Sequence, residues 1–280
     1  MATDPGSTPT PAPARTPHQV SPTTYRLRMW EYLLRSWRPY FWSTLGEALI
    51  APVLYLLALG LGMGSLVNRN GTAALGGVPY VNYIAPALLV AAAVQVAMGE
   101  STFATFARFK WNRTLWGTTS TPITPPQALD GHVLFIGTRL LISTAMYFLV
   151  LVVFGVAGGP SGLLMIPVAM LCGLACAVWV LTLTASIDDD GPMAFNLLLR
   201  FVVLPMTLFS ATFFPIGQLP WSVRWLAFFS PLWHGNELAR ACALGGLSWP
   251  QIAGHLAFLL VMLVTGFLMA RRRFTRRLVV

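Results

Sequence analysis

Charged side chains are scarce in this chain, and lysine is almost missing. Only 10 % of the 280 residues are charged, whereas 56 % are hydrophobic, a balance that a water-soluble domain does not show. Lys110 is the sole lysine, and it stands between Phe109 and Trp111. A phosphate-binding loop needs a glycine-rich turn followed by Lys and Ser or Thr. The composition therefore predicts an integral membrane protein and excludes a P-loop ATPase.

Metal-binding patterns are equally sparse. Cys172 and Cys176 are two of only three cysteines and lie four apart in an apolar run, where small packing residues fit better than a metal pair or a disulfide. The acidic run Asp188–Asp190 places neighbouring side chains in different directions, and Asp190 before Gly-Pro suits the start of a helix. We expect no metal site.

The chain divides into a tail, an amphipathic helix and a membrane domain. Residues 1–24 are rich in Pro, Thr and Ala without an apolar core, which predicts a disordered tail rather than a signal peptide. Residues 25–41 repeat apolar side chains at helical spacing, with Arg and Glu opposite, which predicts an interfacial helix with Trp at headgroup depth. Within residues 42–280, six apolar runs are long enough to cross a bilayer. They are residues 43–66, 83–106, 132–156, 163–187, 193–214 and 252–270. The expected fold class is an all-α integral membrane protein with six transmembrane helices.

Basic residues set the expected orientation. An even number of spans puts both termini on one side, and thirteen of the 18 basic residues fall there, against three on the other side. This bias predicts cytoplasmic termini, and it explains the net charge of +9 without a nucleic-acid partner. The thirteen are Arg15, Arg26, Arg28, Arg35, Arg38, Arg108, Lys110, Arg113, Arg271, Arg272, Arg273, Arg276 and Arg277.

Two connections carry unusual sequence. On the cytoplasmic side, RFKWNRTLWG predicts a basic and aromatic helix that TTSTPITPP ends. Such a helix indicates a protein partner, or alternatively a helix lying on the inner leaflet. On the outer side, Pro215, Gly217 and Pro220 break the fifth apolar run before two short aromatic helices. These predict a re-entrant or interfacial hairpin between the fifth and sixth spans.

Both connections resemble one family. The run FFPIGQLPWSVRWLAFFSPLWHGNELARACALG resembles the C-terminal signature of permease subunits of type-2 ATP-binding-cassette (ABC-2) exporters. The run ESTFATFARFKWNRTLWGTTSTPITPPQALDG is similar to the family's cytoplasmic loop. The resemblance covers residue 25 to the end, and it is nearest to the branch that includes nodulation-factor (lipo-chitooligosaccharide) exporter permeases.

The resemblance implies a six-helix subunit of a bacterial plasma membrane that dimerises and docks two copies of a separate ATPase. That ATPase would bind ATP and Mg²⁺, so we expect no cofactor in this chain. The loop helix of residues 106–121 would couple the two proteins, and the amphipathic helix would line their interface. The coupling residues would be Arg108, Phe109, Lys110, Trp111, Arg113, Thr121 and Pro122, with Trp30, Glu31, Arg35 and Trp37 on the interfacial helix.

Four charges interrupt the predicted spans. Counted from the predicted cytoplasmic ends, all four lie roughly 6–15 Å deep at the helical rise, where an unpaired charge is costly. They are Glu47, Glu100, Arg139 and Arg200. Two acids and two bases at one level predict mutual neutralisation. The cluster is either a structural tie between helices or a polar gate that selects substrate headgroups.

The predicted hairpin carries a second polar set. His234, Glu237 and Arg240 share one helix face, but no nucleophile or second carboxylate accompanies them as catalysis would need. Pairing within the hairpin and guidance of a substrate both remain open.

The function expected is the permease of an ATP-driven exporter, working as a homodimer or paired with a similar subunit. It would export an amphipathic, lipid-linked or hydrophobic molecule such as a glycolipid, lipo-oligosaccharide or polyketide. A drug-resistance exporter of the same family is the nearest alternative. Outside the family, an intramembrane lipid-modifying enzyme or a passive channel or scaffold stays open.

Overall fold

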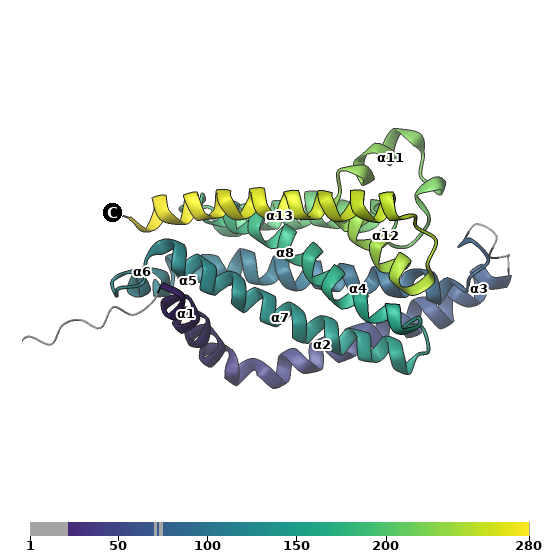
Figure 1. Ribbon diagram of the computed structural model, residues 1–280, viewed down its shortest axis with the longest axis horizontal. Helices are drawn as coiled ribbons and strands as arrows, with labels where there is room; N and C mark the ends of the chain where they lie inside the picture. The colour runs from purple at the N-terminus through teal and green to yellow at the C-terminus, as the bar shows by residue number, and fades with distance from the viewer. Residues whose placement is uncertain (1–21, 70–71, 73–74, 280) are drawn as a thin grey trace, which may run out of the picture.

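The structure is a computed structural model that describes residues 22–69, 72 and 75–279, and its helices form one elongated bundle (Figure 1). No strand occurs in these ranges. Six helical runs are long and apolar enough to cross a membrane, which confirms the all-α fold class with six spans. They are Thr23–Arg69, Tyr80–Lys110, Pro125–Val153, Pro160–Thr184, Gly191–Phe209 and Trp249–Leu278. The first and last differ most from the predicted ranges, because both continue into the basic segments beside them.

The two ends of the bundle differ in their contents (Figure 1). One end, here called the terminal end, holds α1 (Pro22–Trp37), α6 (Thr114–Thr119) and the close of α13 (Trp249–Leu278). The opposite end, here called the hairpin end, holds α3 (Gly64–Arg69), and α11 and α12 lie toward it. The last two are Trp221–Phe228 and Pro231–Leu244.

The expected amphipathic helix is continuous with the first span. A short 3₁₀ turn, η1 (Arg38–Tyr40), joins α1 to α2 (Phe41–Tyr55); its Pro39 lacks the N–H that a regular α-helix needs there. α1 packs on α7 (Pro125–Val153). Its most buried apolar residues are Met29 and Leu33, whereas Leu27, near the start of the helix, is 48 % exposed. Trp37 is buried as well, and Trp30 and Leu34 pack against the core, so contact with α7 widens the predicted apolar face to include Met29 and Leu33.

Three membrane helices contain π-helical turns. η2 (Leu56–Met63) continues α2, and η4 (Glu100–Ala104) links α4 (Tyr80–Gly99) to α5 (Thr105–Lys110). η6 (Leu199–Val203) likewise links α9 (Gly191–Leu198) to α10 (Leu204–Phe209). Such turns insert a residue into the α-helical ladder and change the direction of the side chains beyond them, often at functional sites.

The centre of the bundle is α4, which packs on α8 (Met165–Thr184), α7 and α12. In the most apolar window of the α4 run, 72 % of residues are buried, against 11 % for the α9–α10 run and for α13. α12 reaches this centre because Gly235 has no side chain: a Cβ there would lie 2.8 Å from Val90 and 2.9 Å from the Cys172 sulfur. The predicted hairpin thus has one member inside the bundle. Its re-entry into a bilayer stays a prediction.

The other member of the hairpin is exposed. A 3₁₀ turn, η7 (Ile216–Gln218), precedes α11, and the aromatic side chains of this segment face outward. Trp221 is 85 % exposed and Phe229 is 74 % exposed. Aromatic side chains of this kind suit the headgroup region of a membrane.

Candidate functional site

The helix expected through RFKWNRTLWG is interrupted at Arg113, which corrects the sequence prediction. Arg113 has a left-handed backbone, with φ 50° and ψ 23°, a conformation that ends helices. The Asn112 N–H donates to the Ala107 carbonyl at 2.8 Å and closes α5. Trp116 then donates its indole N–H to the Phe109 carbonyl at 3.1 Å. Because these bonds satisfy the end of α5, α5 and α6 form a corner instead of one helix.

One aromatic residue of this corner is buried rather than available to a partner. Phe109 is 2 % exposed and meets Phe274 of α13 edge-on at 5.0 Å between ring centroids. The Arg277 guanidinium lies over the Phe109 ring at 4.3 Å and donates to the Thr184 carbonyl at 2.7 Å. This arrangement, here called the Phe109 clamp, fastens α5 to the ends of α8 and α13.

The remaining predicted coupling residues lie at the surface of the terminal end. Lys110 pairs with Asp189 in the connection between α8 and α9, and the hydrogen bond and charge of Lys110 hold the pKa of Asp189 below its usual value. Four others are exposed: Trp111, Arg113, Thr121 and Pro122. Arg108 is the exception, because its side chain turns into the bundle.

On α1, the structure separates the predicted residues into two that pack against the bundle and two that are exposed. Trp30 donates its indole N–H to the Thr138 hydroxyl of α7 at 3.0 Å, and Trp37 is buried. Both tryptophans therefore contact protein rather than only headgroups. Glu31 and Arg35 form an exposed ion pair at 2.6 Å, and they remain accessible on the outer side of the helix.

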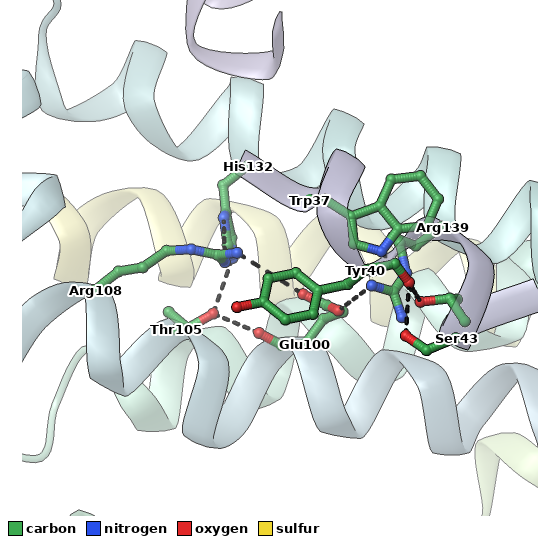
Figure 2. Close-up of polar contacts among 9 residues, drawn as sticks. Trp37, Tyr40, Ser43, Glu100, Thr105, Arg108, His132 and Arg139 are labelled. Atoms are coloured by element: carbon green, nitrogen blue, oxygen red, sulfur yellow. Dashed lines mark hydrogen bonds and ion pairs between the residues drawn. The ribbon is translucent and has the colours of Figure 1, made fainter. Parts of the chain in front are cut away.

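An ion pair joins two of the four predicted intramembrane charges. Figure 2 shows the Glu100 carboxylate between two guanidinium groups. Its Oε1 lies 3.0 Å from Arg139 Nη1, and its Oε2 lies 4.0 Å from Arg108 Nη2. All three side chains are at most 18 % exposed. Glu100 opens the π turn η4, so the turn helps to aim its carboxylate at α7.

A buried histidine completes this cluster, and its tautomer follows from its partners (Figure 2). The Thr105 hydroxyl donates to the Glu100 carbonyl at 2.6 Å, so its oxygen must accept from His132 Nε2, 2.8 Å away. The other ring nitrogen, Nδ1, faces Arg108 Nη1 at 3.4 Å and must accept from it. His132 is therefore neutral with its proton on Nε2, and the cluster carries a net positive charge.

The other two predicted charges lie apart from this ion pair. Glu47 is exposed and lines a cavity together with Glu100 and Arg139, but no ion pair joins it to a residue of the described chain. Arg200 is exposed in η6 and has no ion-pair partner in the described ranges. The four charges do not all neutralise one another as expected, because the helical depth of a residue does not fix its direction around the helix.

At the hairpin end, Arg240 fastens α12 to its surroundings. It pairs with Glu237 at 2.9 Å, and its guanidinium lies over the Tyr83 ring at 4.0 Å. It also donates to the backbone carbonyls of Tyr83, at 3.2 Å, and of Ala211. Ala211 has φ 54°, an unusual conformation for a residue with a Cβ. These contacts are those of a buried structural anchor.

His234 shares the face but has different partners. Its Nε2 donates to the Phe228 carbonyl at 3.0 Å, so its Nδ1 must accept from His255 Nδ1 at 2.8 Å. The ring also stacks on Phe258 at 3.9 Å. Burial lowers the pKa of His234 to about 4, which keeps it neutral. The three predicted residues therefore form two separate sets of contacts.

Sequence reasoning missed three members of these sites: Thr105, His132 and His255. Each polar side chain stands in or beside an apolar run, and that is a usable signal, since intramembrane histidines are rarely without a partner. Which partner each one finds depends on contacts across 21 to 27 residues of sequence.

Comparison with known proteins decides the family. Residues 26–244 match the family described as ABC-2 type transporter. The chain belongs to the ABC-2 type transporter family. It is therefore a multi-pass membrane protein and a transport subunit of an exporter rather than an enzyme, which removes the lipid-modifying alternative. Membership of this ABC-2 family also implies an ATPase partner.

Three relatives match this ABC-2 chain over most of its length and most of their own. It is 29 % identical over 255 residues to Nodulation protein J of Sinorhizobium fredii (strain NBRC 101917 / NGR234), which covers 90 % of this chain and 93 % of the relative. Nodulation protein J of Rhizobium leguminosarum bv. viciae is 27 % identical over 252 residues, with 90 % and 94 % covered. The Rhizobium meliloti (strain 1021) protein of that name is 26 % identical over 252 residues, with 90 % and 93 % covered. These matches confirm the resemblance to nodulation-factor exporter permeases.

Proposed function

We propose that this ABC-2 permease is driven by a separate ATPase that docks on the terminal end and that it exports an amphipathic or lipid-linked molecule. The observation that carries the proposal is the corner between α5 and α6. Its tip is exposed at Trp111 and Arg113, while the residues just before the tip are fixed inside the bundle by the Phe109 clamp. A partner that pushes on the tip would therefore move α5, α8 and α13 together.

The same corner connects to the buried charges. α5 continues through η4 into α4, and Arg108 of α5 reaches Glu100 and His132. Displacement of the tip would be passed along one helical run to the centre of the bundle. Because packed elements shift as units rather than deform continuously, this route is suited to transmit a conformational change of the ATPase to the bundle. In this proposal the terminal end faces the cytoplasm, and a second copy of the chain completes the path.

A co-purification experiment tests the docking surface. Trp111→Ala and Arg113→Gly remove exposed side chains, and glycine is suited to the left-handed backbone of position 113. We expect both variants to keep the fold and to retain about tenfold less of a co-expressed ATPase subunit than the wild type retains, a loss of about 1.4 kcal/mol. Trp249→Ala is the matched control, because Trp249 is 83 % exposed on α13 at the hairpin end.

The result that contradicts the proposal is equally clear. ATPase retention at the wild-type level in both tip variants would place the interface elsewhere. Export that proceeds in vesicles without any ATPase would refute the energy source. A permease for hydrophobic drugs would use the same docking surface, so the co-purification experiment does not distinguish the two substrate classes. Competition for export between lipid-linked and drug-like molecules, measured in those vesicles, does.

A further inference from the structure

A cavity of about 350 Å³ lies between α2, α4 and α7, and Thr207 and Phe213 also line it. Arg139, Ser143 and Tyr147 line it from α7, at intervals of four residues, which is one face of a helix. The lining positions of α2 and α4 recur at similar intervals. One face from each of three helices therefore encloses this space.

The polarity of the cavity changes along its length. α2 and α7 run from the terminal end, whereas α4 runs toward it (Figure 1). Glu47, Glu100 and Arg139 consequently line its terminal side, while Tyr55 and Tyr147 lie farther toward the hairpin end. The eight residue steps from Arg139 to Tyr147 correspond to about 12 Å along the helix. The cavity thus has a charged part and an apolar, aromatic part, as an amphipathic ligand has.

The charged part favours a cation. Its one guanidinium, that of Arg139, is held by Glu100 at 3.0 Å, and it also lies over the Trp37 ring at 4.9 Å. Glu47 has no ion-pair partner in the part of the chain that the structure describes. The Arg108 guanidinium also faces Glu100, so Arg108 and Arg139 together balance Glu100 and Glu47. Glu47 is nevertheless the lining carboxylate that no guanidinium of the described residues holds, and an ammonium group would pair with it.

A second observation points to a ligand in the same space. Tyr147 is 3 % exposed, and its hydroxyl lacks a hydrogen-bond partner. A buried hydroxyl without a partner is unfavourable. Because Tyr147 lines the cavity, a polar group of a bound molecule would satisfy it.

We propose that this cavity binds an amphipathic molecule carrying a positively charged amino group, which pairs with Glu47. The apolar part of the molecule lies along Tyr55 and Phe213. The proposal rests on the exporter function above and names the chemical class of its substrate. Glu47 acts as the group that selects positive over neutral or negative heads.

Binding of a simple amphiphile to the full chain tests the site. The chain is placed in phosphatidylcholine nanodiscs, and radiolabelled dodecylamine is displaced by unlabelled dodecylamine, dodecanol or dodecyl phosphate, with empty nanodiscs subtracted. We expect saturable binding and displacement by dodecylamine at a concentration about tenfold lower than by the other two. Glu47→Gln should weaken binding about tenfold, and Glu47→Asp should keep most of it. Asp190→Asn is the matched control, because Asp190 is an exposed acid outside the cavity.

Each outcome decides the proposal. Glu47→Gln removes an unpaired charge, so it should not impair folding, and its thermal midpoint checks this. Ala51→Trp leaves Glu47 in place but fills the cavity with a large side chain, and it should abolish binding. Unchanged binding in either variant, or stronger displacement by dodecyl phosphate, overturns the proposal. The binding assay needs no ATPase. An absence of dodecylamine binding therefore does not contradict the proposed ATPase docking, and an absence of docking does not contradict dodecylamine binding.

Discussion

At the scale of the residue, the molecule depends on a few polar contacts inside an apolar bundle. Glu100 illustrates them, since its carboxylate lies 3.0 Å from Arg139 and 4.0 Å from Arg108. Burying charges is unfavourable, but removing one partner of a buried pair is worse, because the other charge stays behind. The geometry therefore favours a structural tie between helices for this pair, the first of the two alternatives that the sequence left open.

A double-mutant cycle tests the tie. Glu100→Gln leaves two guanidinium groups without a carboxylate and should destabilise the protein by about 3 kcal/mol. The double variant Glu100→Gln/Arg139→Gln should recover much of that loss. Thermal midpoints in detergent measure both, and Glu31→Gln serves as control because the Glu31–Arg35 pair is exposed. Arg139→Gln alone completes the cycle, and a loss in the double variant equal to the sum of the two single losses would show that the pair is not coupled.

At the scale of the element, helices approach one another where glycine permits. A Cβ on Gly131 of α7 would lie 2.7 Å from the Arg26 carbonyl oxygen and from Met29. The neighbour is backbone, so it cannot rotate away. The contact of α1 with α7, and with it the position of the exposed Glu31 and Arg35, depends on this absence of a side chain.

Alanine substitutions on one helix test this dependence. Gly131→Ala should lower stability by about 1–3 kcal/mol through overpacking. Gly137→Ala, also on α7, meets nothing within 4 Å and should be neutral or slightly stabilising because alanine favours helix. Thermal midpoints compare the two. Equal effects would mean that α1 does not pack as described.

The hairpin should respond to pH. Between pH 6.5 and about 4, His234 is protonated in the unfolded protein but not in the folded protein, because burial lowers its pKa in the folded state to about 4. Stability should therefore fall as the pH falls through this range. The groups around it are Trp233 on its own helix, the Phe228 carbonyl, and His255 and Phe258 on α13. Glu237 acts on the neighbouring His255. The thermal midpoint of the wild type should decline more steeply from pH 6.5 to 4.5 than that of His234→Asn. Parallel curves would contradict this assignment.

At the scale of the whole molecule, orientation is the expectation with the widest consequences. After the cysteines at 172, 176 and 242 are replaced by alanine, Ser120→Cys and Gln218→Cys each introduce one exposed thiol. We expect an impermeant maleimide added to intact cells to label position 218 and not 120, because the basic residues retain the terminal end inside. Labelling of position 120 from outside would reverse the topology and remove the proposed docking surface from the cytoplasm.

How far the sequence predicts this molecule depends on the range of the interaction. Apolar run length is local, and it predicted all six spans. The corner at Arg113 was missed because its left-handed backbone is stabilised by the reach of Trp116 back to Phe109. Side-chain direction was predicted least well: Arg200 lies within a spanning helix as expected, but its side chain is exposed instead of joining the ion pair. The π turn at Glu100 likewise has no local signature of glycine or proline within it.

The Phe109 clamp also sets an order of events during synthesis. Phe274 and Arg277 follow Phe109 by about 165 residues, which a ribosome adds in roughly 8–33 s at 5–20 residues per second. Throughout that interval α5 is already made, but the ring and guanidinium that hold it do not yet exist. The surface proposed to receive the ATPase is thus finished only with the last turns of α13, so a nascent permease cannot present it early.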